Sequence, residues 1–118
     1  MKRTKKELLE SIEKKVVKSL LVAKNTLYIE YLDGCKAIRL HDTDIITQKS
    51  NGNIVLNSGG FKTPTTKERL NRRSYPININ CPGIYQKNYQ WFVGENSVFY
   101  NGITFNENGD QVSPQKNR

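Results

Sequence analysis

The first 24 residues carry an apolar stripe with the period of an α-helix. Thr4 and Glu7 have the spacing of a capping box, in which each side chain accepts a hydrogen bond from the backbone amide of the other residue. At about 100° per residue, the apolar positions fall within roughly a third of the helix circumference. These positions are Leu8, Leu9, Ile12, Val16, Leu20 and Ala23. The pattern predicts an amphipathic helix over residues 1–24 that packs on a sheet.

From residue 25 the period of the apolar positions changes to two. Asp33-Gly34 and Asn51-Gly52 are strong turn signals between the alternating segments. The pattern therefore predicts a meander of three or four antiparallel strands. The strands are expected near residues 27–32, 36–40, 45–47 and 54–56.

A second, short helix is expected in the middle of the chain. Thr65 and Glu68 again have capping-box spacing, and the helix is predicted over about residues 66–73, with Leu70 as its anchor to the core. Tyr75-Pro76 would end it, because the residue before proline avoids the helical region.

The last third of the chain returns to short apolar segments. A brief strand is expected at 77–79, and two hairpins should follow, one around Lys87-Asn88 and one around Asn101-Gly102. The paired segments would be 84–85 with 91–93, and 98–100 with 103–105. Together the patterns predict one α+β domain in three parts. These are an N-terminal helix at 1–24, an antiparallel α+β unit at 25–105 and a polar, flexible tail at 106–118.

Composition adds a preference for anionic partners. The 118 residues include 19 Lys and Arg against 11 Asp and Glu, a formal net charge of +8. Such a charge suits a nucleic acid or a nucleoprotein. Cys35, Cys81 and the single His41 have no metal-ligand spacing, so no metal or cofactor is expected. With no membrane-length apolar run and no secretory signal, we expect reduced thiols, no membrane partner and the host cytoplasm.

The basic cluster at residues 62–73 is the strongest candidate site, because five cations there face only Glu68. Arginine binds phosphate through a planar fork, the first amides of a helix attract anions, and Gly-Gly lets a ligand approach the backbone. The candidate binding residues are Gly59, Gly60, Lys62, Thr65, Thr66, Lys67, Arg69, Arg72 and Arg73. In the structural alternative, the two glycines form the turn, the threonines cap the helix, and the arginines are exposed to water.

Two further groups of residues each allow a functional and a structural interpretation. His41 precedes Asp42 and Asp44, which is the composition of a general base with an orienting carboxylate. No nucleophile-elbow serine accompanies them, so a structural role is favoured and the protein is expected not to be an enzyme. Aromatic residues crowd around Lys87, where they either fill the core or stack on single-stranded bases. They are Tyr85, Tyr89, Trp91 and Phe92.

The middle of the chain resembles a group of small phage-associated proteins. Segments 37–45, 54–61 and 63–71 match that group's LHxTxI, LNSGGW and TxTTKxRxN patterns, within a resemblance that covers residues 25–105. Phe61 stands where the group usually has tryptophan. The resemblance implies a phage setting. By class analogy, it implies a non-enzymatic inhibitor of host nucleic-acid-based defence, similar to an anti-CRISPR protein, acting on a nuclease–RNA complex. The alternatives are a general nucleic-acid-binding accessory protein and a phosphate-handling enzyme that uses His41.

Overall fold

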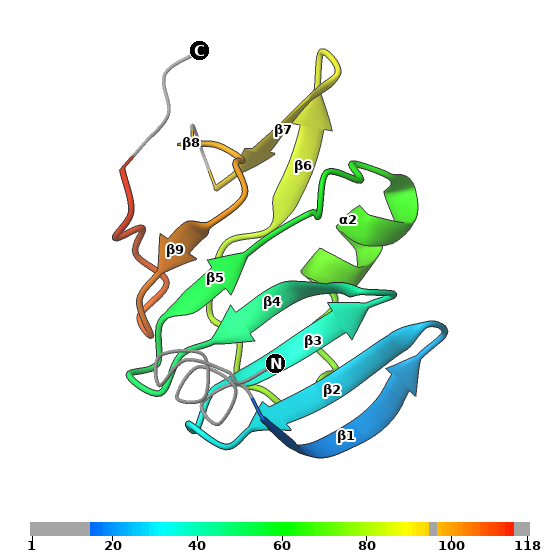
Figure 1. Cartoon of the computed structure of the whole chain (residues 1–118). Helices are drawn as coiled ribbons and strands as arrows, with labels where there is room; N and C mark the ends of the chain where they lie inside the picture. The colour runs from blue at the N-terminus through cyan, green and yellow to red at the C-terminus, as the bar shows by residue number, and fades with distance from the viewer. Residues whose placement is uncertain (1–14, 95–96, 115–118) are drawn as a thin grey trace, which may run out of the picture.

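A six-stranded antiparallel sheet forms the larger layer of the computed structural model, which describes residues 15–94 and 97–114 (Figure 1). Its strand order is β1-β2-β3-β4-β5-β9, so five consecutive strands form a meander and the last strand returns beside β5. The strands are β1 Val16–Ala23, β2 Thr26–Tyr31, β3 Lys36–Leu40, β4 Thr43–Gln48, β5 Ile54–Leu56 and β9 Ile103–Phe105. The meander predicted from the period-two pattern is confirmed.

The prediction of an N-terminal helix packed on a sheet is wrong. Val16–Ala23 is a strand, paired antiparallel with β2, and the described chain is mostly β rather than helix-on-sheet α+β. The predicted helical stripe does not include Val17, Leu21 and Val22, although these residues are as apolar as its members. Adjacent apolar residues, several of them β-branched, fit the two faces of a strand better. Residues 1–14, which hold the predicted capping box, lie outside the described residues.

The second predicted helix is present, shifted by two residues. Helix α2 spans Pro64–Asn71, and its N-cap is Thr63, whose hydroxyl accepts from the Thr66 amide at 3.1 Å. Proline suits the first helical position because its missing N–H would have no intrahelical partner there. Leu70 is buried and anchors α2 to the sheet, as expected.

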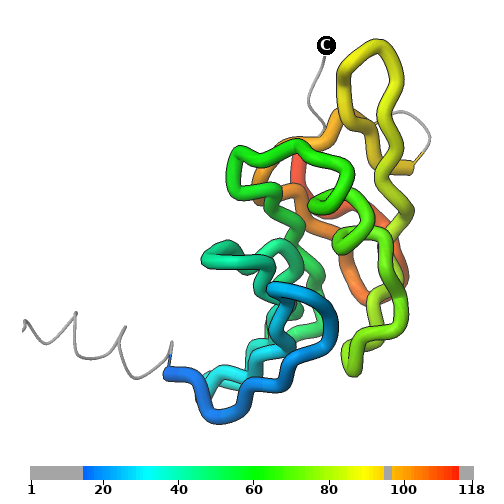
Figure 2. The backbone as a smooth tube through the Cα atoms, turned by 90° about the vertical axis from the view of Figure 1, so that its right-hand side faces the viewer, coloured from blue at the N-terminus to red at the C-terminus, as the bar shows by residue number. Residues whose placement is uncertain are grey.

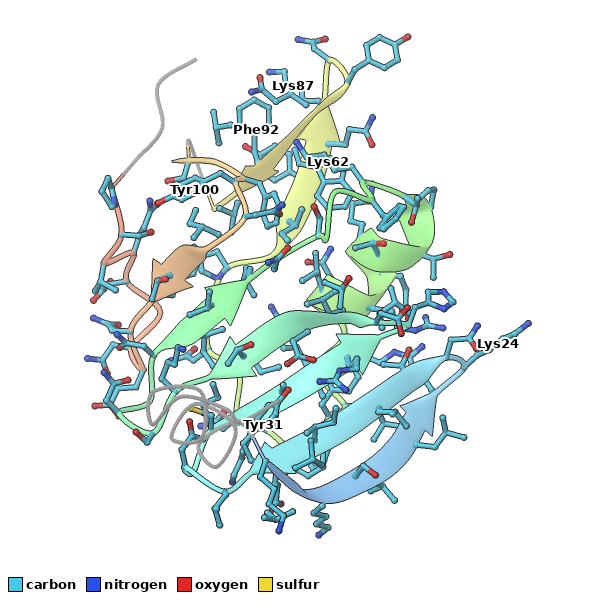
Figure 3. All side chains as sticks on the ribbon, viewed as in Figure 1. Lys24, Tyr31, Lys62, Lys87, Phe92 and Tyr100 are labelled. Atoms are coloured by element: carbon cyan, nitrogen blue, oxygen red, sulfur yellow. The ribbon has the colours of Figure 1, made fainter. Side chains whose placement is uncertain are left out.

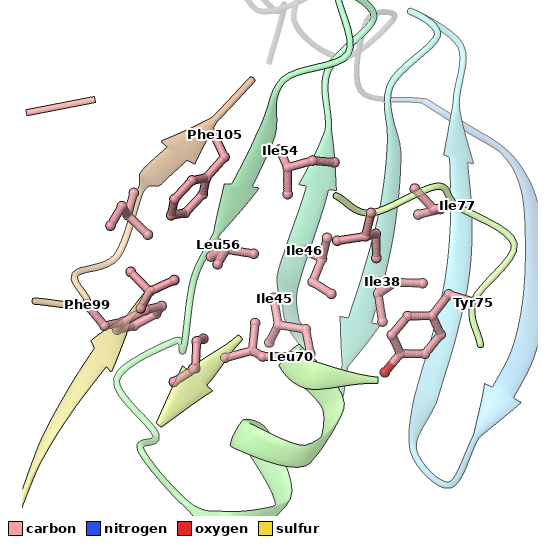
Figure 4. Packing of buried hydrophobic residues seen from close by; sticks show 14 of the residues in the cluster. Ile38, Ile45, Ile46, Ile54, Leu56, Leu70, Tyr75, Ile77, Phe99 and Phe105 are labelled. Carbon is pink, nitrogen blue, oxygen red and sulfur yellow. The ribbon is translucent and has the colours of Figure 1, made fainter. Parts of the chain in front are cut away.

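The core lies on one face of the large sheet. Figure 2 shows α2 and the segment 75–81 on the same side of the strands. In that segment Tyr75, Ile77 and Ile79 are buried, and the residues between them are exposed. The strand predicted at 77–79 is therefore extended and packed but forms no ladder. Figure 4 shows Tyr75 and Ile77 on the same side of the sheet as Ile38 and Ile46. Ile79, Ile54 and Leu56 belong to the same buried cluster.

A smaller sheet of three strands completes the described fold. It consists of β6 Ile84–Lys87, β7 Gln90–Val93 and β8 Ser97–Val98, in that order. The first predicted hairpin is confirmed as β6–β7. The second is wrong, because β8 pairs with β7 while β9 pairs with β5. Phe99 is buried edge-on against Trp91, so the chain enters the core there and changes sheets at the Asn101-Gly102 turn.

The segment after β9 folds back on that strand. The Val112 amide donates to the Thr104 carbonyl at 2.9 Å, and Phe105 and Gln111 form a β-bridge. The Ser113 hydroxyl accepts from the Thr104 amide at 2.9 Å. Residues 106–114 of the predicted tail thus lie along the edge of β9, and 115–118 lie outside the described residues.

Candidate functional site

A cleft of about 790 Å³ lies at one end of the large sheet, where four chain segments meet. The β1–β2 turn, the β3–β4 turn, the loop after β5 and the first turn of α2 form its walls. Its lining comprises Lys24, Asn25, Leu40, His41, Asp42, Thr43, Ile45, Ser58, Phe61, Thr63, Thr65, Thr66 and Arg69. The three sequence segments that carry the phage resemblance therefore come together around one hollow.

Two tight turns form one wall of the cleft. Asn25 and His41 both have positive φ, at 55° and 54°, a region in which asparagine and histidine are enriched among non-glycine residues. The His41 amide donates to the Asn25 carbonyl at 2.9 Å, which ties the two turns together. The His41 side chain is exposed at the rim.

The loop that holds Gly59 and Gly60 contributes Ser58 and Phe61 to the lining of the cleft, whereas the two glycines themselves do not line it. The amides of both glycines bond within the loop. The Gly59 amide donates to Asn57 Oδ1 at 2.7 Å, and the Gly60 amide donates to Ser58 Oγ at 3.2 Å. A Cβ on Gly59 would lie 2.5 Å from Thr43 Oγ1, so the absence of a side chain lets this loop close on the β3–β4 turn. The loop amides are therefore structural donors rather than a free anion nest.

The start of α2 offers little backbone capacity for an anion. Pro64 has no amide proton, Thr66 N donates to the Thr63 hydroxyl, and Lys67 N donates to the Thr63 carbonyl at 3.0 Å. In the described part of the chain, the Thr65 amide alone among these first helical positions has no acceptor. The Thr63 hydroxyl also lies 3.0 Å from the Thr66 hydroxyl, so only the Thr65 side chain faces solvent freely.

Arg69 is a structural tie between α2 and the sheet. Its Nε donates to Thr26 Oγ1 at 3.0 Å, and its Nη2 lies 3.5 Å from the Lys24 carbonyl. Its Nη1 also donates to Glu68, and only 14% of the side chain is exposed. One edge of the guanidinium lines the cleft, but its donors are already directed at protein oxygens.

Arg72 and Arg73 are also bonded within the chain. Arg72 binds Glu68 Oε1 through Nε at 3.0 Å and Nη2 at 2.6 Å, so Glu68 serves two arginines. These hydrogen bonds, that from Arg72 foremost, lower the pKa of the Glu68 carboxyl. Arg73 donates to the carbonyls of Leu70, Arg72 and Cys81. The fork donors that a polyanion would need are largely engaged at all three predicted arginines.

Free cationic capacity lies with lysines instead. Among the described residues, the ammonium groups of Lys24, Lys62 and Lys67 have no acceptor, and Lys24 and Lys62 extend away from the ribbon (Figure 3). Phe61, beside Lys62, is 66% exposed although it lines the cleft. Sequence reasoning included Lys62 and Lys67 but missed Lys24, which fell at the end of the wrongly predicted helix. An exposed Phe61 was also missed, since an aromatic residue in a motif reads as a core anchor.

The structure separates His41 from one of its two predicted acidic neighbours. Asp44 accepts from Arg39 Nε at 2.7 Å and from the Tyr31 hydroxyl. Tyr31, Arg39 and Asp44 line a second hollow, of about 440 Å³, that shares no residue with the cleft beside His41. Burial and the bond to Asp44 raise the pKa of Tyr31 to about 12. Asp42 lines the same cleft as His41, but no hydrogen bond joins the two side chains in the described structure.

The aromatic group at residues 85–92 divides between core and surface. Trp91 and Phe92 are buried, and Tyr85 stacks on Phe92 with ring centroids 5.5 Å apart. Tyr89 is almost fully exposed at the tip of the β6–β7 hairpin. The core interpretation therefore holds for Trp91 and Phe92, while stacking on bases stays a prediction for the exposed Tyr89.

The family of the chain is shown by a sequence-family match. A family model described as Kyanoviridae Gp96 protein, a phage protein, matches residues 1–113. The chain belongs to this family. No curated protein and no solved structure matches it. The expected phage setting is thus confirmed, and the family match includes residues 1–24, which the resemblance had left out.

The described residues contain neither a metal-ligand cluster nor a membrane-length helix. No group of three histidine, cysteine, aspartate or glutamate side chains is placed to hold a metal ion within residues 15–94 and 97–114. In the same residues, no helix has the length and apolar character needed to cross a bilayer.

Proposed function

We propose that this phage protein is a non-enzymatic binding protein that inhibits nucleic-acid-based host defence, with its cleft set against a nuclease–RNA complex. The observation that carries the proposal is the rim of the cleft. There the exposed ring of Phe61 and the ammonium group of Lys24, which has no acceptor in the described chain, line a hollow of about 790 Å³. Lys62 and Lys67 do not line it, but each directly adjoins a lining residue in the chain.

The rim offers the two interactions that single-stranded nucleic acid uses. Lysine ammonium groups neutralise phosphates and release counterions, and an exposed phenyl ring stacks on a base. Phe61 and Lys62 are adjacent in the chain, so a ring and a charge reach the same nucleotide segment. The Thr65 hydroxyl and the His41 imidazole add polar groups inside the rim.

The internal engagement of the arginines favours a nucleoprotein over free nucleic acid. Three lysines neutralise about three phosphates, which for a single strand corresponds to a salt slope near −2 in log K against log salt. Such a small electrostatic contribution supports only weak binding of free RNA. A protein partner would supply the remaining contact area. The general nucleic-acid-binding alternative draws its support from the net charge of +8.

Capture of host complexes by the full chain tests the proposal. Tagged protein is incubated with host lysate, with and without ribonuclease, and its binding to labelled single-stranded RNA is measured separately across salt concentrations. A cleft variant and a control variant remove equal charge. The cleft variant is K24Q/K62Q/K67Q, in which Lys24 lines the cleft and the other two lysines adjoin lining residues in the chain. The control is K36Q/K49Q/K87Q, whose lysines neither line the cleft nor adjoin a residue that does.

We expect a nuclease-containing complex to be retained by the wild type and the control and lost by the cleft variant. Phe61→Ala should weaken capture about tenfold, in line with the loss of one stacked base. Equal loss in both triple variants would show that only net charge matters. Tight binding of free RNA with a steep salt slope would instead support the accessory-protein alternative.

A further inference from the structure

β1 is an edge strand with an unusual surface for this protein. It is the longest strand of the large sheet, and in the described residues its outer edge pairs with no other strand. Six of its eight residues are apolar, in a chain of mean hydropathy −0.69. The apolar side chains exposed on β1 and the turn after β2 are Val16, Val17, Leu20, Leu21 and Leu32.

Both faces of β1 are open. Leu20 lies opposite Tyr28, on the core side of the sheet, whereas Leu21 lies opposite Leu27 on the other side. Leu20 is about half exposed even so, because β1 extends beyond the layer formed by α2 and residues 75–81. The register with β2 shifts near each end of β1, between Val16 and Lys18 and between Leu21 and Ala23, so the regular stretch is Lys18–Leu21. There an apolar edge strand with free amides and carbonyls is a template for pairing with another strand.

We propose that two copies of this chain associate through β1, joining their large sheets into one continuous antiparallel sheet. Pairing through one strand on each copy produces a two-fold axis, the commonest symmetry of homo-oligomers. With the axis at Ser19, Lys18 faces Leu20 of the second copy, and Leu21 lies next to the irregular Val16–Val17 end of that copy's β1. No two lysines of the strand then lie directly opposite, a placement that would be unfavourable.

The chemistry of the strand selects a second copy over an anionic partner. Lys18 is the single charged side chain of β1, so the strand gives a polyanion little to bind. An apolar strand is matched by another apolar strand, and among the described edges of this protein β1 supplies that pattern. The register also offsets charge within each copy, because Lys18 lies opposite Glu30 of its own β2.

The association leaves both clefts accessible. The cleft lies at the Lys24 end of β1, beyond the paired residues. In an antiparallel pair, the two Lys24 ends point in opposite directions. The dimer would therefore present two clefts at opposite ends of one sheet, and the inference holds whether or not the proposed function is correct.

Sedimentation equilibrium of the full chain, with Leu21→Lys as the test variant, decides the proposal. Leu21 is 68% exposed, so a lysine there disturbs the folded monomer little, while it would place a charge in the apolar seam of the dimer. We expect a dimer for the wild type and a dissociation constant raised about tenfold or more for the variant. Val112→Lys is the matched control, at a valine 53% exposed on the opposite edge of the sheet, and should leave the dimer intact.

A second variant tests the register without weakening the strand. Ser19→Cys places one thiol of each copy at the two-fold axis, so mild oxidation should give a covalent dimer. The wild type, which has Cys35 and Cys81, is the control and should give none. A monomeric wild type, with β1 covered by another segment of the chain, would overturn the proposal. A dimer that Leu21→Lys leaves unchanged would also overturn it.

Discussion

Arg69 shows how a single residue can carry the charge of a binding site and the contacts of a structural one. Its sequence neighbours present a run of cations, which is typical of a phosphate-binding face. In the structure its guanidinium bonds Thr26, a fully buried residue, and the Lys24 carbonyl. The position of a charge can be read from sequence, whereas its partner depends on which strand lies beside the helix.

Arg69→Ala should destabilise the fold. Loss of its hydrogen bonds leaves the buried Thr26 hydroxyl without its donor and should lower the free energy of unfolding by about 1–2 kcal/mol. Urea denaturation measures the effect. Lys67→Ala, two residues earlier in α2 and at a side chain without an acceptor, should change stability by less than about 0.5 kcal/mol. Equal effects of the two changes would contradict the structural role of Arg69.

The adjacent glycines of the cleft loop should respond differently to alanine. Both have positive φ, +65° at Gly59 and +84° at Gly60, so each substitution costs about 1–2 kcal/mol of backbone strain. Only at Gly59 would the new methyl group meet Thr43, whereas the space around Gly60 is open. Gly59→Ala should therefore be the more destabilising by at least about 1 kcal/mol in thermal unfolding. The reverse order would show that the loop is not held against the β3–β4 turn.

At the scale of elements, α2 is held by side-chain bonds to backbone as well as by its apolar anchor. The Asn71 side chain accepts from the Ile84 amide at 2.7 Å and donates to the Ile84 carbonyl at 2.8 Å. This pair reproduces the hydrogen bonding of a strand neighbour and fixes the last turn of α2 to the start of β6. The asparagine in the TxTTKxRxN segment therefore has a structural explanation.

Asn71→Ala should uncouple α2 from the smaller sheet. Two backbone groups of Ile84, a buried residue, would lose their partners, at a cost of about 2–3 kcal/mol in stability. Hydrogen exchange should also accelerate at the Ile84 amide. Asn78→Ala, at an exposed asparagine whose side chain has no acceptor in the described chain, is the control and should change neither quantity.

The elements that sequence predicted correctly were those with local signals. Asp33-Gly34, Asn51-Gly52 and the alternation between them fix a meander, because turn and strand patterns agree there. The prediction for residues 16–23 failed because a helical stripe of three apolar residues can be drawn through a segment in which six of eight residues are apolar. The β8–β9 hairpin failed because Asn101-Gly102 specifies a turn but does not specify which strand comes next to it.

For the molecule as a whole, three tyrosines make the stability of the fold depend on pH in the alkaline range. Burial raises the pKa of Tyr28, Tyr31 and Tyr75 to about 12, with hydrogen bonds to Glu30 and Asp44 adding to the shift for the first two. In the unfolded chain these phenols titrate near 10. The folded state thus retains protons that the unfolded state has lost, and its stability is complete below about pH 10 and falls as the pH rises toward 12.

Urea midpoints between pH 8 and pH 11.5 test this linkage. We expect a plateau up to about pH 10 and a decline above it. Tyr75→Phe should reduce the decline because one of the three contributing phenols is gone, although it also removes the hydrogen bond to the Arg69 carbonyl at 2.7 Å and lowers the plateau. An unchanged slope above pH 10 in that variant would exclude Tyr75 from the effect.

Only part of the candidate site was accessible to sequence reasoning. The segments around His41, Gly59 and Thr65 were identified, but their convergence on one cleft depends on how the turns meet at the end of the sheet. Lys62 and Lys67 were among the predicted residues, whereas Lys24 and the exposed Phe61 emerged only from the structure. The sequence shows which residues carry charges and hydrogen-bond donors, while tertiary packing decides which acceptor each donor binds.

The two margins of the large sheet differ in a way that limits how far assembly can proceed. Beside β9, the segment around Gln111 occupies the strand edge, while β1 has no such cover in the described chain. A sheet with two unprotected edge strands can add copies at both edges and grow into fibrils. Because one edge of the large sheet is covered by its own chain, a second copy can add only at β1. Growth of this sheet therefore stops at a dimer.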